Sequence, residues 1–190
     1  MKIGIIGSQG VGKTTLAATM AEELDIYFIE EQIREVVKRY NPLGYKTPDD
    51  LVGSMWYPHM MLDIYEQQLE KELSAKDGFV SDRTTLDYYA YYKVLNCDSS
   101  VVTDLFEKAF LRHYKNHYDL VIFVPIAFPV LNDNYRNTDE TFRLRMDTHL
   151  RDIMYLNQNV YILNGNTLSE RVEEVKKLID SITKKDQTII

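Results

Sequence analysis

The chain has almost no cysteine, no long apolar run and no surplus of positive charge. Its single cysteine, Cys97, excludes an internal disulfide, and the first residues lack the charged stretch, apolar core and cleavage site of a secretory signal. We therefore expect a reducing, cytoplasmic location. The longest apolar stretch, Leu120 to Leu131, is too short to cross a bilayer and is interrupted by Pro125 and Pro129, so no membrane partner is expected.

The charge balance is acidic. Lys and Arg together number 22 against 29 Asp and Glu, which gives a net charge of −7. A surface of this sign repels phosphate backbones, so small-molecule substrates fit better than a long nucleic-acid footprint, although a local cleft for DNA stays open. No linker or repeat divides the 190 residues, of which 45% are hydrophobic, so we expect one domain over residues 1–190.

One motif near the amino terminus is complete. Residues 7–14 read Gly-Ser-Gln-Gly-Val-Gly-Lys-Thr, the Gly-x-x-x-x-Gly-Lys-Thr pattern of a phosphate-binding loop. An apolar run precedes the motif and a helical run follows it, as the motif requires; an ordinary glycine-rich turn is the alternative. The loop predicts that ATP binds there with Mg²⁺. The predicted nucleotide-binding residues are Gly7, Gly10, Val11, Gly12, Lys13, Thr14 and Thr15.

Within this loop two side chains have chemical roles. Lys13 can reach the outer phosphates of ATP, and the Thr14 hydroxyl can ligate the magnesium ion that travels with them.

Short apolar runs alternate with longer helical patterns along the chain. This alternation is typical of an α/β fold in three layers, here a five-stranded parallel sheet with helices on both faces. The predicted strands are Lys2 to Ile6, Ile26 to Ile29, Gly78 to Ser81, Leu120 to Pro125 and Val160 to Leu163. Ligands of such sheets bind beyond the carboxyl ends of the strands.

The sequence also predicts three well-marked helices. A cap at Thr47 starts a long helix that ends at Asp77, a second spans Thr84 to Cys97, and a capping box at Thr167 to Glu170 starts a third. The four histidines show no zinc-binding spacing with Cys97 or with one another, so we expect them at the surface or rim.

Charged residues follow two of the predicted strands. After the second strand, Glu31 could prepare an acceptor hydroxyl and Arg34 could hold an anion or a base edge, or both could be a helix-face ion pair. After the third strand, Asp82 would face Thr14 and could bind magnesium or act on the acceptor. Arg83 could neutralise phosphate charge and bind the substrate. The alternative is a helix cap and a solvated arginine.

A polar segment over about 132–145 predicts a helical lid. Arg136, Arg143 and Arg145 lie in it, and arginines on a lid can screen charge during phosphoryl transfer. Arg136 and Arg143 are the predicted catalytic pair, and salt bridges along a helix face are the alternative.

Taken together, these motifs resemble the P-loop nucleoside and nucleotide kinases. The run from Asp82-Arg83 to Tyr91 looks like the Asp-Arg motif of thymidylate kinases, although Thr84 stands where that pattern has Tyr. The pattern Glu31-x-x-Arg34, with the stretches 118–125 and 133–143, looks like the nicotinamide riboside kinase type of ATPase domain. By resemblance, Lys13, Thr14, Asp82, Arg83 and the loop arginines would act in transfer of the ATP γ-phosphate.

The sequence therefore predicts a kinase that uses ATP and Mg²⁺ to phosphorylate a nucleoside or a nucleoside monophosphate. A kinase acting on a modified, hydroxymethylated base in DNA and a nucleotide-gated regulatory ATPase are the alternatives. Which of Glu30, Glu31 and Asp82 acts on the acceptor stays open, as does a homodimer.

Overall fold

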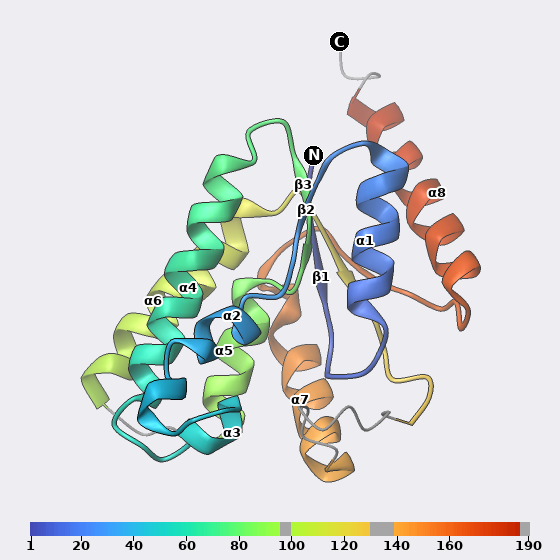
Figure 1. The fold of residues 1–190 in the computed structure, drawn as a ribbon. Helices are drawn as coiled ribbons and strands as arrows, with labels where there is room; N and C mark the ends of the chain where they lie inside the picture. The colour runs from blue at the N-terminus through green and yellow to red at the C-terminus, as the bar shows by residue number, and fades with distance from the viewer. Residues whose placement is uncertain (96–99, 130–138, 187–190) are drawn as a thin grey trace.

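A computed structural model describes residues 1–95, 100–129 and 139–186 of the chain (Figure 1). Cys97, Arg136 and the first part of the predicted lid lie outside these residues. Five parallel strands form one sheet in the order β2-β3-β1-β4-β5. Their bounds are β1 Lys2–Ile6, β2 Tyr27–Ile29, β3 Phe79–Asp82, β4 Leu120–Phe123 and β5 Val160–Ile162. The predicted parallel sheet is confirmed: β1 has the predicted bounds, and the other strands differ from the prediction by one or two residues at one or both ends.

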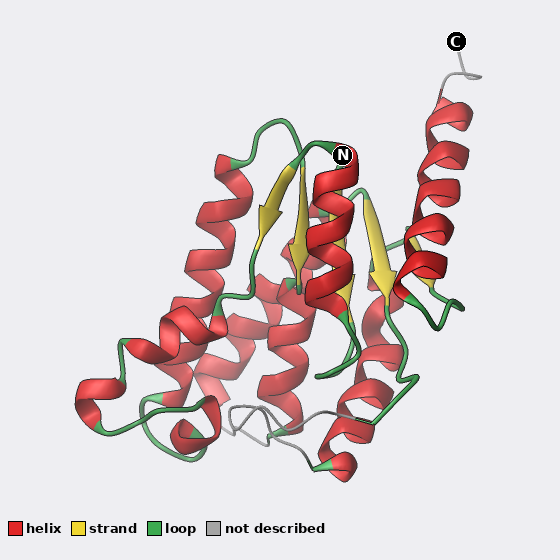
Figure 2. Cartoon of the chain, turned by 45° about the vertical axis from the view of Figure 1, so that its right-hand side comes forward, coloured by secondary structure: helices red, strands yellow, loops and turns green. Residues whose placement is uncertain are grey.

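Helices cover both faces of this sheet, as the three-layer prediction requires (Figures 1 and 2). On one face lie α1 (Lys13–Leu24) and α8 (Leu168–Asp186), and on the other α5 (Thr85–Val94), α6 (Ser100–His117) and α7 (Glu140–Ile153). Side chains alternate along each strand, so Ile3 and Ile5 of β1 pack under α1 while Ile6 packs toward α5 and α7. The two faces therefore have separate apolar cores.

At Gly4 the sheet and α5 approach very closely. A Cβ atom at this position would lie 2.4 Å from Thr84 Cγ2, which is closer than carbon atoms can approach. Glycine in β1 therefore allows the first turn of α5 to lie directly against the strand that leads into the phosphate-binding loop.

A third cluster of buried side chains lies among the helices beside the sheet. The helices α2 (Ile33–Lys38), α3 (Pro48–Leu51) and α4 (Tyr57–Ser74), together with the 3-10 helix Asn41–Leu43, pack there against α5 and α6. Its largely aromatic and sulfur-containing side chains include Tyr40, Tyr57, Met60, Met61, Ile64, Tyr88, Tyr92 and Phe110. This cluster forms a helical subregion at the end of the sheet where β2 and β3 lead into α2 and α5.

The prediction of a single long helix after Thr47 is wrong. The capping box at Thr47 is present, with Asp50 N donating to Thr47 Oγ1 over 3.3 Å, but the helix that it starts ends at Leu51. Gly53 follows with a φ of +77°, a left-handed conformation that a continuous helix does not contain, and α4 begins at Tyr57. The capping box at Thr167 is confirmed: Glu170 N donates to Thr167 Oγ1 over 3.3 Å.

Among the helices of the described residues, none combines the length and the apolar character needed to cross a bilayer.

Candidate active site

The phosphate-binding loop joins the carboxyl end of β1 to α1. Gly7 lies against the backbone of the segment after β4, because a Cβ there would come within 2.6 Å of the Val124 carbonyl oxygen. Gly12 caps α1 with a φ of +92°, a left-handed conformation that favours glycine. The amino end of α1 is thus placed at the loop, where backbone N–H groups and the helix dipole favour an anion.

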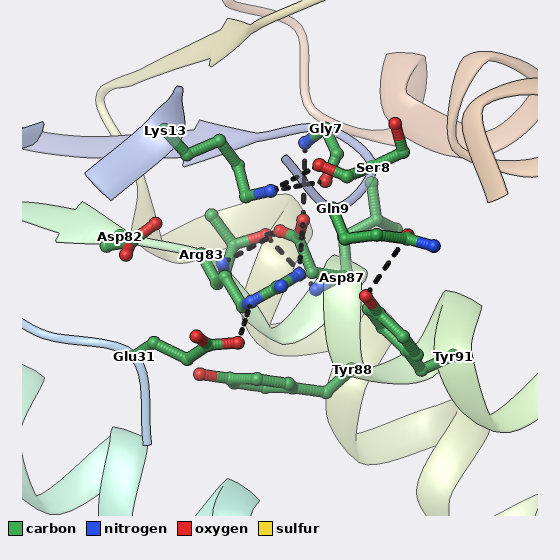
Figure 3. A network of polar contacts seen from close by, with 12 residues as sticks. Gly7, Ser8, Gln9, Lys13, Glu31, Asp82, Arg83, Asp87, Tyr88 and Tyr91 are labelled. Atoms are coloured by element: carbon green, nitrogen blue, oxygen red, sulfur yellow. Dashed lines mark hydrogen bonds and ion pairs between the residues drawn. The ribbon is translucent and has the colours of Figure 1, made fainter. Parts of the chain in front are cut away.

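Lys13 lies inside this loop rather than in solvent (Figure 3). Its side-chain amine donates to the carbonyl oxygens of Gly7, over 2.8 Å, and Ser8, over 2.6 Å, and only 5% of the residue is exposed. Burial and, to a smaller extent, the nearby Arg83 charge lower the pKa of Lys13 to about 8. The environment of the loop therefore makes Lys13 lose its proton at a lower pH than an ordinary lysine does.

Thr14 and Asp82 come together because β1 and β3 are neighbours in the sheet, with Ile5 opposite Asp82. Thr14 Oγ1 donates to Asp82 Oδ2 over 2.5 Å. The other oxygen, Asp82 Oδ1, is buried and makes no hydrogen bond within the described residues, and burial raises the pKa of Asp82. A hydroxyl beside a carboxylate oxygen with unused acceptor capacity is a donor set that suits Mg²⁺.

Arg83 has a backbone φ of +90°, a conformation that is rare for residues other than glycine. Its Nε donates to Glu31 Oε1 over 2.5 Å, its Nη1 lies 3.7 Å from Asp87 Oδ1, and its guanidinium carbon lies 5.1 Å from the centre of the Tyr91 ring (Figure 3). Strained backbone of this kind is common at functional sites. The guanidinium is thus fixed between two carboxylates and an aromatic face.

Asp87 is a residue that the sequence reasoning missed. Its carboxylate is fully buried and accepts from Gly7 N over 3.3 Å and from Thr84 N over 2.9 Å. Thr84 and Asp87 form the capping box of α5, so the helix-cap role considered for Asp82 belongs to Thr84. The spacing Thr-x-x-Asp is the signal that could have found it. Asp87 therefore ties the phosphate-binding loop to α5.

Two adjoining pockets share Glu31 and Arg83. The loop pocket is lined by Gly10, Gly12, Lys13, Thr14, Thr15, Glu31, Asp82 and Arg83. The second, here called the helical pocket, is lined by Gln9, Glu31, Ile33, Arg34, Pro48, Asp49, Tyr57, Met60, Met61, Ile64, Arg83, Tyr88, Tyr91 and Leu95. The structure therefore brings together the predicted residues Glu31, Arg34 and Arg83, with the last at the junction to Lys13, Thr14 and Asp82.

Arg143, expected on a lid, is instead a fully buried side chain of α7. Its Nε donates to the Gln9 carbonyl oxygen over 3.1 Å and its Nη2 to the Phe128 carbonyl oxygen over 2.8 Å. It lines neither of the two pockets. Arg145 is exposed and donates to the Val94 carbonyl oxygen over 3.0 Å. Of the predicted lid, the described part is thus the start of α7, and Arg143 supports the loop backbone.

Arg171 of α8 supports the loop from another side, and no signal in the sequence identified it. Its Nη1 donates to the Val11 carbonyl oxygen and its Nε to the Gly165 carbonyl oxygen, each over 2.8 Å, and the residue is 4% exposed. The turn after β5 is thereby connected to the phosphate-binding loop. Such a contact between residues 160 positions apart depends on the tertiary fold.

The sequence of the chain is similar to those of known proteins. The family AAA_28, described as an AAA domain, matches residues 2–171. The "Putative adenylate kinase" of Methanocaldococcus jannaschii is 32% identical over 117 residues, which are 60% of this chain and 60% of that protein. The matched part of the chain thus spans about 60% of the length of this curated relative.

Solved structures show the same fold at low sequence identity. A deoxyadenosine kinase from M. mycoides, solved with the products dCMP and dCDP, has a TM-score of 0.69 and 17% identity, covering 95% of this chain and 100% of that one. A thymidylate kinase from Candida albicans has a TM-score of 0.69 and 14% identity, covering 95% and 91%. With the phosphate-binding loop in place, the predicted resemblance is confirmed, and the chain belongs to the AAA_28 family and has the fold of the P-loop nucleoside and nucleotide kinases.

Proposed function

We propose that the protein is a kinase that transfers the γ-phosphate of ATP to a nucleoside or a nucleoside monophosphate. The observation that carries this proposal is the pair of adjoining pockets, one on the phosphate-binding loop and one among the helices, which share Glu31 and Arg83. A hydrolase needs only the first pocket. A second pocket with apolar and aromatic walls at the point where the phosphates end suits an organic acceptor.

In this mechanism, Lys13 and the backbone N–H groups of the loop hold the β- and γ-phosphates of ATP. Arg83, fixed by Glu31 and Asp87, stabilises the charge that spreads over the phosphoryl oxygens during transfer. Thr14 and Asp82 would hold Mg²⁺, which neutralises phosphate charge and orients the leaving group. Arg143 keeps the loop backbone in place.

The acceptor would bind in the helical pocket. Tyr88 and Tyr91 offer ring faces for a base, and Arg34, exposed at the edge of the pocket, would hold an anion or a base edge. Glu31 is the carboxylate that both pockets share, so we assign to it the preparation of a nucleoside acceptor: it takes the proton of the acceptor hydroxyl as the oxygen bonds to the γ-phosphorus and ADP leaves. A nucleoside monophosphate would attack through an ionised phosphate oxygen, which has no proton to remove.

The test is ADP release from ATP and Mg²⁺ with a panel of nucleosides, nucleoside monophosphates and a DNA oligonucleotide that carries a hydroxymethylated base. We expect turnover that requires one class of nucleoside or nucleotide. Lys13→Ala should lower kcat by roughly 10²–10³-fold without unfolding, because it removes a phosphate contact that strengthens in the transition state. Lys108→Ala, an exposed change on α6, is the matched control and should keep the rate.

Two results would overturn the proposal. ADP formation at the same rate without any acceptor would indicate a nucleotide-gated ATPase. Turnover with the modified oligonucleotide alone would indicate a kinase that acts on DNA, despite the net charge of −7.

A further inference from the structure

A second polar cluster lies at the opposite end of β3 from Asp82. Glu72 of α4 is buried there, with its side chain 0% exposed, and it faces His113 and His117 of α6, whose side chains are 10% and 14% exposed. The His117 ring stacks on Phe79, the first residue of β3, with ring centres 5.9 Å apart. The cluster thus lies about 10 Å along the strand from the candidate active site.

Both imidazoles approach one carboxylate oxygen. Glu72 Oε2 lies 2.6 Å from His113 Nε2 and 3.3 Å from His117 Nε2. The histidines are four residues apart, so they share one face of α6, and their rings stack with centres 4.2 Å apart. The ligand atoms of the three residues all lie within 4.8 Å of one another.

Two neighbours fix the orientation of the carboxylate. The other oxygen, Glu72 Oε1, accepts from Tyr118 Oη over 2.7 Å and from Gln68 Nε2 over 2.6 Å. These hydrogen bonds leave Oε2 directed at the two histidines. Outer hydrogen bonds of this kind orient the ligands of protein metal sites.

Hydrogen bonds within the cluster do not account for all of these atoms. His113 satisfies Glu72 Oε2, but His117 Nε2 is buried and makes no hydrogen bond in the described part of the chain. Two imidazole nitrogens and a carboxylate oxygen that converge in this way are a donor set that suits a transition metal. A surface groove borders the two histidines, and a water molecule entering from it would supply the fourth ligand. The groove is lined by Tyr65, Leu69, Ala109, Arg112, His113, Asn116 and His117.

We propose that Glu72, His113 and His117 form a binding site for a divalent transition metal, zinc foremost. The ion joins α4 to α6 and thereby clamps the helical subregion at its base. Magnesium does not suit the site, because Mg²⁺ prefers oxygen ligands in octahedral geometry. This proposal departs from the expectation that the histidines have no zinc-binding spacing, while the partial exposure of His113 and His117 agrees with a position at the rim. It is independent of the proposed kinase activity.

The site is also connected to the candidate active site. Gln68 donates to Ser81 Oγ over 2.8 Å, and Ser81 Oγ donates to the Arg83 carbonyl oxygen over 2.7 Å. Glu72, Gln68 and Ser81 therefore form a hydrogen-bonded path from the metal site to the strained backbone at the end of β3.

The experiment is a Co²⁺ titration of the unaltered protein without nucleotide and with excess Mg²⁺, followed by visible absorption. We expect d–d bands of a four-coordinate site at one Co²⁺ per chain, which Zn²⁺ removes by displacement. Zn²⁺ at about a hundredfold excess over its Kd should raise Tm by roughly 5–10 °C. His113→Gln and His117→Gln keep a polar side chain beside Glu72 and should each abolish the bands.

The matched control is His59→Gln, an exposed histidine of α4 outside the cluster, which should keep the bands unchanged. The proposal is overturned if the unaltered protein shows neither bands nor a Zn²⁺-dependent shift in Tm. It is also overturned if the bands survive in both cluster variants. The native titration needs no variant, so a variant that fails to fold does not prevent a decision.

Discussion

Lys13 is the ionisable side chain of the phosphate-binding loop, and its pKa depends on its surroundings. Burial places its pKa at about 8 in the folded protein, against 10.5 for an ordinary lysine. Because the folded-state pKa is the lower one, the buried charge costs stability below about pH 8, and this cost disappears as the pH rises toward 10.5. A bound triphosphate has the opposite effect, since it favours the ammonium form.

Nucleotide binding should therefore take up a proton when the pH is about one unit above the pKa of Lys13. The measurement is calorimetry of ATP binding in two buffers that differ in ionisation enthalpy. Lys13→Arg carries a permanent charge and should show no such uptake. Equal proton uptake by the unaltered protein and by this variant would contradict the assignment.

The candidate-site residues whose positions could be predicted from the sequence are those with a local signature. Lys13 and Thr14 follow from the loop pattern, and Asp82 and Arg83 from their place at a strand end next to β1. The capping spacing from Thr84 could have located Asp87 at the start of α5, but not its contact with Gly7 N, 80 residues away. Arg171 could not be placed at all, because its partner in the loop is a backbone oxygen 160 residues away, which leaves no pattern in the sequence.

Among the elements, α7 is linked to the loop through a single buried arginine. Arg143 makes two hydrogen bonds from a fully buried guanidinium to carbonyl oxygens on separate segments, at Gln9 and Phe128. A lysine has the charge but lacks the planar fork that reaches both oxygens. The contact therefore depends on arginine at this position.

Arg143→Lys should lower the free energy of unfolding by about 2 kcal/mol, the value typical of lost hydrogen bonds from a charged group. Urea denaturation with an unchanged m-value is the measurement. Arg145→Lys, an exposed arginine two residues further along α7 with one backbone contact, should change stability by less than about 0.5 kcal/mol. Equal losses in the two variants would show that the loop contacts of Arg143 do not stabilise the fold.

The helix boundaries that were predicted least well lie between Thr47 and Asp77, where the sequence has no clear signal for the end of a helix. The capping residues at Thr47 and Thr167 start helices as expected, because a cap acts within one turn. Gly53 breaks the first of these helices, and its left-handed backbone could not be inferred from a lone glycine in a helical pattern.

At the scale of the whole molecule, the five-stranded sheet was predictable because buried parallel strands are short, apolar and regularly spaced by helices. The helical subregion of α2, α3 and α4 was not, since its packing depends on tyrosines and methionines contributed by separate helices. Its core is distinct from the cores on the two faces of the sheet.

Ligands should therefore protect the two parts of the molecule separately. Hydrogen exchange followed by mass spectrometry should show that ATP with Mg²⁺ slows exchange in the phosphate-binding loop and at the start of α5. The acceptor should slow exchange in α2 and α4, which line the helical pocket. Protection of α2 and α4 by ATP alone, to the same extent as by the acceptor, would contradict this division.

The separation of the helical cluster from the sheet cores has a consequence for how such a chain diversifies. Met60, Met61 and Ile64 line the helical pocket but contribute nothing to the loop pocket. If the proposed function holds, substitutions among them would reshape the acceptor pocket and leave unchanged the residues that would hold the triphosphate. New specificities can thus arise by drift or by laboratory selection in one region, at little risk to the chemistry encoded in the other.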